Sequence, residues 1–398
     1  MLDLTKAAAQ ADTMIHRLRD GRAERRAHLD TALDQIKKSE ATFESLKHKI
    51  AASKPIWLTA GLIEPPARRL PAPPAPSNHT ILATDGSHID VDRHQSARCY
   101  LINIGRVRLD YGQEARAELT SIPKLCADKD EMVLSDGLRE QAVEGTLLGV
   151  KRAVAELDHL AEMSREVEPV RPTLALTDGS LIMWGLANER YPDFVSKKLL
   201  ENSYLKTMDE IYRLAKDNHL TLASYISFPR TTDVVNALRL LLCPNTIADC
   251  ERHCQNVPGF KRPCETIAGV HDSDIFECLL AVGERSAIFY NQSQIIKRYG
   301  PHHVYFFYLK LAGEVARIEV PEWIASDPEK LSQTHALIWD QCQRGDGYPV
   351  ALAEAHEQAV VTGTDRANFQ QMLEHWLITE HLPQTTSAKS QSKRARWV

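Results

Sequence analysis

The 398-residue sequence lacks any long apolar run that would place it in a membrane or mark it for secretion. Its N-terminal segment, MLDLTKAAAQADTMIHRLRD, has no uninterrupted apolar stretch after a basic one. No later stretch approaches the roughly 20 apolar residues that span a bilayer. These absences predict a cytoplasmic protein with no membrane partner. They also favour reduced thiols or metal ligands over a disulfide framework for the eight cysteines.

Two common catalytic signatures are missing as well. The nearest approach to a phosphate-binding loop, GTLLGVK at 145–151, lacks the required Gly-x4-Gly-Lys-Ser/Thr spacing. Any ATP-driven step must therefore come from a partner. No Ser-His-Asp order or nucleophile elbow accompanies Ser87 or Ser180, so we expect both to be turn residues whose hydroxyls bond nearby backbone.

The charges are unevenly distributed along the chain. Residues 1–75 carry 13 basic and 9 acidic residues, and residues 381–398 carry four basic residues and no acid, so each end has a charge of +4. Because the whole chain has a formal net charge of -5, the middle carries -13. An acidic middle argues against coating nucleic acid by bulk electrostatics, since phosphate binding draws on clustered Lys and Arg.

The pattern of residues divides the chain into four parts. Residues 1–54 are rich in helix formers, with an apolar stripe at helical spacing formed by Leu29, Leu33, Ile36, Phe43, Leu46 and Ile50. This stripe covers either the protein's own core or a second subunit or partner. Residues 55–75 form a proline-rich linker without regular structure. A single larger domain is expected over 76–380, followed by a disordered basic tail at 381–398.

The segment after residue 76 predicts a mixed α/β fold. An early strand and hairpin precede a long helix within 131–165, which leads into an apolar strand ending in TDGS. Further strands are expected at 221–228, 286–290 and 303–309, then an acidic connection, then helices near 328–343 and 350–361. Strands that alternate with helices beside a hairpin indicate a mixed sheet flanked by helices.

Two apolar strands, ILAT and LALT, each end in Asp-Gly-Ser, at Asp85 and Asp178. A carboxylate at a strand end, followed by a glycine that lets the chain turn, presents an oxygen ligand above a sheet. Two carboxylates a few Å apart repel each other unless a cation lies between them, and Mg²⁺ or Mn²⁺ takes oxygen ligands readily. A single Asp-Gly is usually only a turn former, but the pair favours a metal site.

Several separated motifs together resemble the NurA nuclease family. They are ATDGSHIDVDRHQSARCYLINIG, AELDHL before LALTDGSL, SYISFPRTTDVV and GYPVALAEAH, in that order over about residues 76–365. The resemblance implies a ribonuclease-H-like core and manganese-dependent hydrolysis of single- and double-stranded DNA, with magnesium as the alternative ion. It also implies a homodimer that works with a HerA-like hexameric ATPase in DNA end processing, repair or defence.

The same resemblance assigns the site residues. The family's two aspartates match Asp85 and Asp178, and its helical acidic residue matches Glu156, with Asp158 as the competing choice. A Tyr and a His separated by eight residues close the family's site, and Tyr348 and His356 have that separation. Asp85, Glu156, Asp178 and His356 are the implied metal ligands. Tyr348 is expected to orient the phosphate or to stack near the scissile nucleotide.

Other functions and sites remain open at this level. A catalytically weak docking subunit of a DNA motor, or a metal phosphohydrolase acting on small esters, would use the same features. Four cysteines could form a second zinc or iron–sulfur site, although their gaps of 7, 4 and 10 residues match no standard ligand spacing; these are Cys243, Cys250, Cys254 and Cys264. The basic KRYGPHH segment at 297–303 could contact phosphates.

Overall fold

The computed structural model describes residues 2–91, 98–187 and 191–382, so most of the predicted basic tail lies outside the described residues. The chain forms two compact units. Unit 1 comprises residues 1–72, 226–293 and 304–319, and unit 2 comprises residues 73–225, 294–303 and 320–398. No helix in the described part of the chain is both long enough and apolar enough to cross a membrane.

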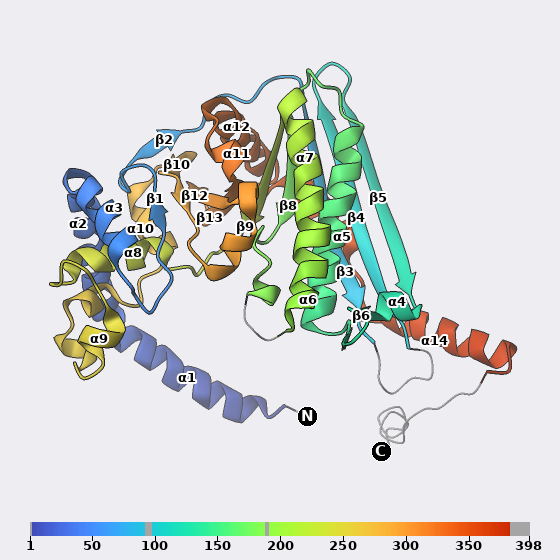
Figure 1. The fold of residues 1–398 in the computed structure, drawn as a ribbon, viewed down its shortest axis with the longest axis horizontal. Helices are drawn as coiled ribbons and strands as arrows, with labels where there is room; N and C mark the ends of the chain where they lie inside the picture. Colours follow the sequence, from blue (N-terminus) through green and yellow to red (C-terminus); the bar gives the residue numbers. More distant parts are fainter. Residues whose placement is uncertain (1, 92–97, 188–190, 383–398) are drawn as a thin grey trace. The chain divides into compact units, whose positions relative to one another are not determined.

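Unit 2 is built on a five-stranded mixed sheet with the order β9-β8-β3-β4-β5 (Figure 1). Strands β3, β4 and β5 are antiparallel neighbours, whereas β8 is parallel to β3 and β9 is parallel to β8. Their bounds are His79–Ile89 for β3, Tyr100–Tyr111 for β4, Arg116–Cys126 for β5, Thr173–Asp178 for β8 and Leu220–Ile226 for β9. This sheet, flanked by helices, confirms the predicted ribonuclease-H-like fold class.

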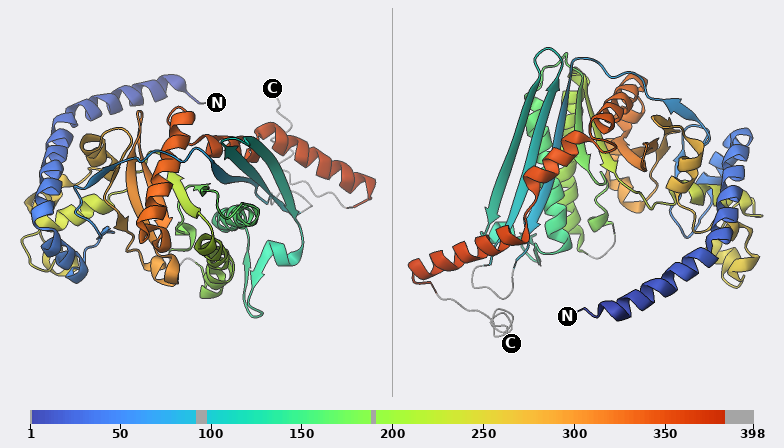
Figure 2. Two further views of the ribbon diagram at one scale, coloured as in Figure 1. Left: turned by 90° about the horizontal axis from the view of Figure 1, so that it is seen from above. Right: turned by 180° about the vertical axis from the view of Figure 1, so that it is seen from behind.

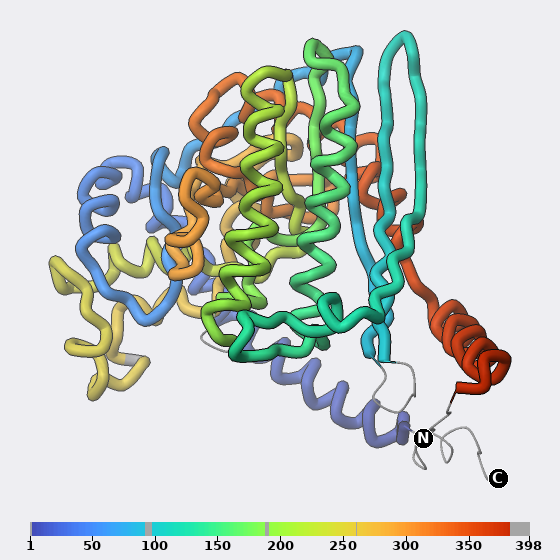
Figure 3. The backbone as a smooth tube through the Cα atoms, turned by 45° about the vertical axis from the view of Figure 1, so that its right-hand side comes forward, coloured from blue at the N-terminus to red at the C-terminus, as the bar shows by residue number. Residues whose placement is uncertain are grey.

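Helices cover both faces of this sheet. On one face α5 (Thr146–Arg165) packs on β3 and lies beside α7 (Leu205–Asp217), as Figure 3 shows. On the other face α13 (Val350–Ala359) crosses β3 and β4, as seen from behind in Figure 2. The expected helix at 328–343 is α12 (Pro328–Arg344), and a further helix, α14 (Gly363–Thr379), has no buried residue.

Shorter elements complete unit 2. They are α4 (Lys129–Met132), β6 (Val133–Ser135), β7 (Glu140–Ala142), η1 (Trp184–Leu186), α6 (Asp193–Ser196), the π-helix η2 (Lys197–Tyr204), η5 (Gln294–Arg298), η6 (Gly300–His302) and α11 (Glu322–Ala325). Strands β6 and β7 form a separate antiparallel pair.

Unit 1 combines the N-terminal helices with two later segments of the chain. Its helices are α1 (Leu4–Asp20), α2 (Arg22–Ala41), α3 (Phe43–Ala52), α8 (Asp233–Leu242), α9 (Cys250–Cys254), η3 (Gly259–Lys261), η4 (Pro263–Ile267) and α10 (Asp272–Leu279). Its strands are β1 (Gly61–Leu62), β2 (Arg69–Pro71), β10 (Glu284–Ser286), β11 (Phe289–Tyr290), β12 (Val304–Lys310) and β13 (Val315–Pro321).

The apolar stripe of residues 29–50 covers unit 1's own core. Ile36, Leu46 and Ile50 are buried in one cluster with residues of α8 and α10, while Leu29 and Leu33 pack at its edge. Helix α1 differs, because none of its residues is buried. The stripe on α2 and α3 therefore covers the protein's own core, as the first of the two interpretations expected, whereas the apolar side chains of α1 stay exposed.

Two details of the expected secondary structure were wrong. The proline-rich segment is extended, but it contributes β1 and β2, which pair with β11 and β10. The expected acidic connection after residue 309 contains β13, whose Arg317 and Glu319 are almost fully buried. Charged residues usually indicate an exposed segment, so the strand was not expected. These charges can be buried because Arg317 and Glu319 pair with each other and Arg317 also pairs with Asp233.

Candidate active site at the carboxylates of unit 2

The two Asp-Gly-Ser motifs lie side by side but differ in conformation. The parallel register pairs Thr84 of β3 with Thr177 of β8, so Asp85 and Asp178 follow on neighbouring strands. The second motif turns as expected, with a left-handed φ of 81° at Gly179. The first does not turn, because β3 continues to Ile89 in register with β4. The turn expected at residues 85–87 was therefore wrong.

Gly86 is required for close packing instead of a turn. A Cβ atom at this position would lie 2.6 Å from Oε1 of Glu156 and 3.0 Å from Cγ of Arg152. The absence of a side chain lets the helix α5 bring Glu156 down onto β3. The hydroxyl of Thr84 donates a hydrogen bond to the backbone oxygen of Glu156 at 3.0 Å, which fixes this approach.

Glu156 is a buried carboxyl group, only 6% exposed. Its pKa is raised to about 8, chiefly by desolvation; the charge of Arg152 opposes this shift, and the charges of Asp85 and Asp178 add to it. The guanidinium Nε of Arg152 lies 3.1 Å from Oε1 of Glu156. Neither of these two buried atoms has a well-oriented hydrogen-bond partner among the described residues. An additional cation would therefore find an unsatisfied oxygen here.

The competing residue Asp158 faces away from this cluster. It is exposed and accepts a hydrogen bond from the hydroxyl of Thr207 on α7. Of the two candidates on α5, Glu156 thus lies beside the aspartates, and Asp158 joins two helices.

His356 and Tyr348 approach the aspartates from the other face of the sheet. Nδ1 of His356 lies 2.8 Å from Oδ2 of Asp85, and the hydroxyl of Tyr348 donates to Oδ1 of Asp178 at 3.4 Å. Desolvation, and then the charge of Asp85, raises the pKa of Asp178, whereas Tyr348 opposes this shift. The structure thus brings together all five residues that the sequence singled out, each in contact with or electrostatically coupled to another.

Backbone contact positions the helix that carries His356. A Cβ atom on Gly105 of β4 would lie 2.1 Å from the backbone oxygen of Ala355. Ser87 donates a hydrogen bond to the backbone oxygen of Ala359 at 2.5 Å, and Asn103 donates to the same atom at 2.9 Å. Ser87 therefore anchors α13 to the sheet, which is a longer-range contact than the local turn expected from the sequence.

The donor set suits a hard divalent cation. No three His, Cys, Asp or Glu side chains within the described ranges are already close enough together to form a metal site. Carboxylates repel one another without a cation, so a looser arrangement is expected before binding. Oxygen donors on Asp85, Asp178 and Glu156, with a buried oxygen of Glu156 left unsatisfied, nevertheless match the ligands that Mn²⁺ and Mg²⁺ prefer.

The cysteines of unit 1 do not form a comparable site. Among the described residues, no three cysteines are close enough together to hold a metal ion, and the described cysteines, which include Cys243 and Cys254, are free. Burial raises the pKa of the Cys250 and Cys264 thiols, which opposes the thiolate form that binds metal. The geometry favours buried free thiols over a zinc or iron–sulfur site.

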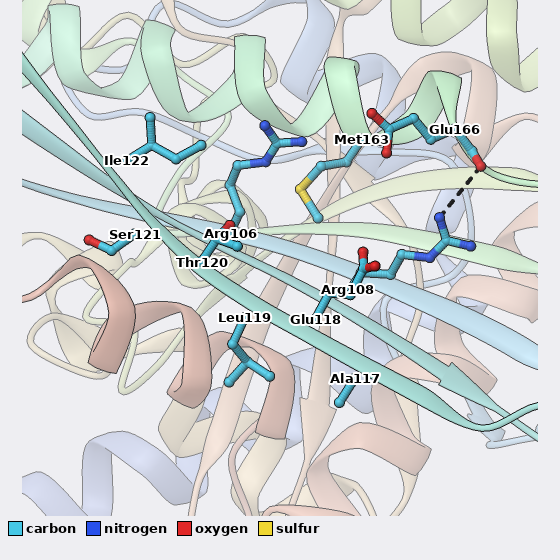
Figure 4. Close-up of a pocket in the computed structure, with 10 residues that line it drawn as sticks. All are labelled: Arg106, Arg108, Ala117, Glu118, Leu119, Thr120, Ser121, Ile122, Met163 and Glu166. Carbon is cyan, nitrogen blue, oxygen red and sulfur yellow. Dashed lines mark hydrogen bonds between the residues drawn. The ribbon is translucent and has the colours of Figure 1, made fainter.

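Basic side chains elsewhere in unit 2 are already paired. A cavity of about 740 Å³ lies between β5 and the end of α5, and Figure 4 shows Arg106 and Arg108 extending across it from β4. Arg106 pairs with Glu162, and Arg108 pairs with Asp110. In the KRYGPHH segment, Arg298 pairs with Glu201 and Asp193. A phosphate at these positions would have to compete with existing carboxylates.

Comparisons with known proteins show the fold and the family of this chain. The crystal structure of the NurA nuclease from Sulfolobus solfataricus is similar over 96% of this chain and 98% of that chain, with a TM-score of 0.52 and 12% identity, which shows a shared fold. Two other solved structures are too dissimilar to support an argument. Prototype foamy virus protease–reverse transcriptase has a TM-score of 0.22 and 16% identity, over 37% of this chain and 18% of that chain. Aquifex aeolicus Argonaute has a TM-score of 0.23 and 11% identity, over 71% of this chain and 28% of that chain. No curated protein matches the chain. A family model described as NurA domain matches residues 79–361, so the protein belongs to the NurA domain family.

Proposed function

We propose that this protein is a divalent-metal-dependent nuclease that hydrolyses phosphodiester bonds in single- and double-stranded DNA. The observation that carries the proposal is the position of Asp85 and Asp178 on the neighbouring strands β3 and β8, with Glu156 of α5 electrostatically coupled to both and carrying a buried oxygen without a hydrogen-bond partner among the described residues. Family membership supports it independently. Manganese is the proposed ion, with magnesium as the alternative.

The chain's own groups suit this reaction. Bound divalent ions would activate water and stabilise the leaving oxygen. Asp85 and Asp178 would hold the ions from the strands, and Glu156 would complete the ligand set from α5. His356, in contact with Asp85, would either ligate an ion or take up a proton, and Tyr348, in contact with Asp178, would orient the phosphate.

Conservative carboxylate variants test the proposal. Asp85→Asn and Asp178→Asn should each abolish cleavage of plasmid and oligonucleotide in Mn²⁺ while keeping the fold, because each removes one ligand charge without changing shape. Asp158→Asn is the matched control and should remain active, since its carboxylate faces α7. Wild-type activity in either aspartate variant would refute the site. Cleavage of a generic phosphate ester but not of DNA would favour the small-ester phosphohydrolase.

We further propose that the protein forms a homodimer and works with a HerA-like hexameric ATPase in DNA end processing, repair or defence. The acidic middle of the chain holds DNA poorly by itself, and the sequence lacks a phosphate-binding loop, so a partner that feeds DNA to the site is needed. Helix α1 is the proposed docking element. Its apolar side chains are exposed, and they include Leu4, Ile15 and Leu18.

The docking test should alter α1 alone. Deleting residues 1–54 would remove Ile36, Leu46 and Ile50 from the core of unit 1 and would confuse docking with unfolding. Replacing Leu4, Ile15 and Leu18 with glutamate should weaken pull-down of the ATPase and its ATP-dependent stimulation of cleavage, with basal cleavage unchanged. Full stimulation of this variant would refute the role of α1. Light scattering of the wild type tests the dimer, and a strict monomer would refute that part.

A further inference from the structure

A second feature lies directly beside the carboxylates. An open cavity of about 410 Å³ has Glu156 and Asp178 in its lining. Most of its remaining wall is apolar or aromatic and comes from α5, the segment after β8 and the end of η2, including Val150, Leu157, Met183, Trp184 and Tyr204. Its volume lies in the range of roughly 300–1,000 Å³ that is typical of small-molecule sites, and it cannot hold a stacked duplex.

The loop that forms one wall is held rigidly. The hydroxyl of Tyr299 accepts a hydrogen bond from the backbone N–H of Met183 at 2.8 Å and donates to the backbone oxygen of Leu181 at 3.1 Å. The hydroxyl of Tyr204 donates to the same oxygen at 3.1 Å. The two tyrosines and the residues Leu181 and Met183 that they contact are all buried. The wall is therefore preorganised, and a ligand need not order it on binding.

Trp184 stands at the exposed end of this wall. Its ring is 44% exposed, and its Nε1 donates to Oγ of Ser180, the last residue of the second Asp-Gly-Ser motif, at 3.2 Å. The next residue, Gly185, packs against α5 so closely that a Cβ atom would lie 2.7 Å from Val150. The indole is thus tethered to the turn that carries Asp178, although it presents a large apolar surface to solvent.

We propose that this cavity receives an unpaired nucleobase of the strand being cut, stacked against Trp184. The inference rests on the proposed nuclease function. A phosphate held at Asp178 and Glu156 would place its own or the adjacent base at the cavity that these residues line. Every base has an aromatic face, so stacking accepts any sequence. The protein would accordingly act on single strands directly and on duplexes where base pairs have opened, most readily at an end.

Binding of an oligonucleotide tests the pocket without requiring cleavage. The probe is a short single strand carrying 2-aminopurine, with Ca²⁺ present to support binding without turnover. Trp184→Ala should weaken affinity by about 5- to 150-fold, the loss that corresponds to one base–aromatic stack, and should abolish quenching of the probe. Trp184→Phe keeps an aromatic face and should restore most of both signals. Trp376→Ala, which removes a 53% exposed tryptophan from α14, is the matched control and should bind as the wild type does.

A cleavage comparison gives a second readout. The wild type should cut a duplex with an unpaired end faster than a blunt duplex, and Trp184→Ala should lose that preference. Wild-type affinity and quenching in Trp184→Ala would overturn the pocket even if the protein is a nuclease. An inactive wild type would instead refute the proposed function, while quenching that depends on Trp184 would still locate the base.

Discussion

The buried carboxyl group of Glu156 leads to a quantitative prediction for the metal-free protein. Its pKa is raised from an ordinary value of 4.5 to about 8, chiefly by desolvation. An acid with a higher pKa in the folded than in the unfolded chain holds its proton more tightly when folded. The free energy of unfolding should therefore be greatest below pH 4.5 as far as this group is concerned, and should fall as pH rises to about 8.

The magnitude follows from the size of this pKa difference. It corresponds to about 5 kcal/mol in total, or about 1.4 kcal/mol for each pH unit within the window. Glu156→Gln keeps the shape of the side chain and cannot ionise. In the presence of a chelator, the free energy of unfolding of the variant should be close to that of the wild type near pH 5 and should exceed it by about 4 kcal/mol at pH 8.

Urea unfolding of both proteins between pH 5 and 8.5 measures this difference. Glu357→Gln, which alters an exposed residue of α13, is the control and should follow the wild type. With Mn²⁺ at pH 8, the wild type should have the higher free energy of unfolding of the two proteins. A bound cation stabilises the ionised wild-type carboxylate, and the amide is a poorer ligand. If the difference in free energy of unfolding between wild type and Glu156→Gln stayed constant from pH 5 to 8.5, the reasoning would be refuted, since this would mean that the carboxyl group is solvated.

Three further predictions concern packing, chemistry and the core. Gly105→Ala should displace α13, because the new Cβ would meet the backbone oxygen of Ala355, and should reduce the cleavage rate about 100-fold or more; an unchanged rate would show that α13 can move without harm. His356→Ala should lower the cleavage rate by roughly 100- to 10,000-fold with little loss of DNA affinity in Ca²⁺, and a parallel loss of affinity would contradict a role in the chemical step. Arg317→Met should lower the free energy of unfolding, measured in urea, by about 3–5 kcal/mol, because it removes the cation from two buried ion pairs, with Asp233 and Glu319; a cost below about 1 kcal/mol would contradict the importance of these ion pairs.

The fold class and the candidate residues could be predicted because their signals are local. Apolar strands, the proline-free helix of residues 146–165 and the duplicated Asp-Gly-Ser motif are short-range patterns. The resemblance then selected Tyr348 and His356, which no periodicity in the sequence marks. Glu156 could not be separated from Asp158 by pattern alone, because two positions on one helix differ only in the direction that each faces.

The sequence by itself determined which residue types were present and where most of the strands and helices after residue 76 would form. Only the tertiary structure decided what surrounds them. It showed that Gly86 serves close packing under Glu156, that β13 hides two buried charges, and that α1 stays uncovered while α2 and α3 do not. It also placed Arg152 and Trp184 beside the carboxylates, although the spacing of Arg152 four residues before Glu156 was visible beforehand. The physical reason is that burial, desolvation and pairing depend on residues distant in the chain, which no local pattern records.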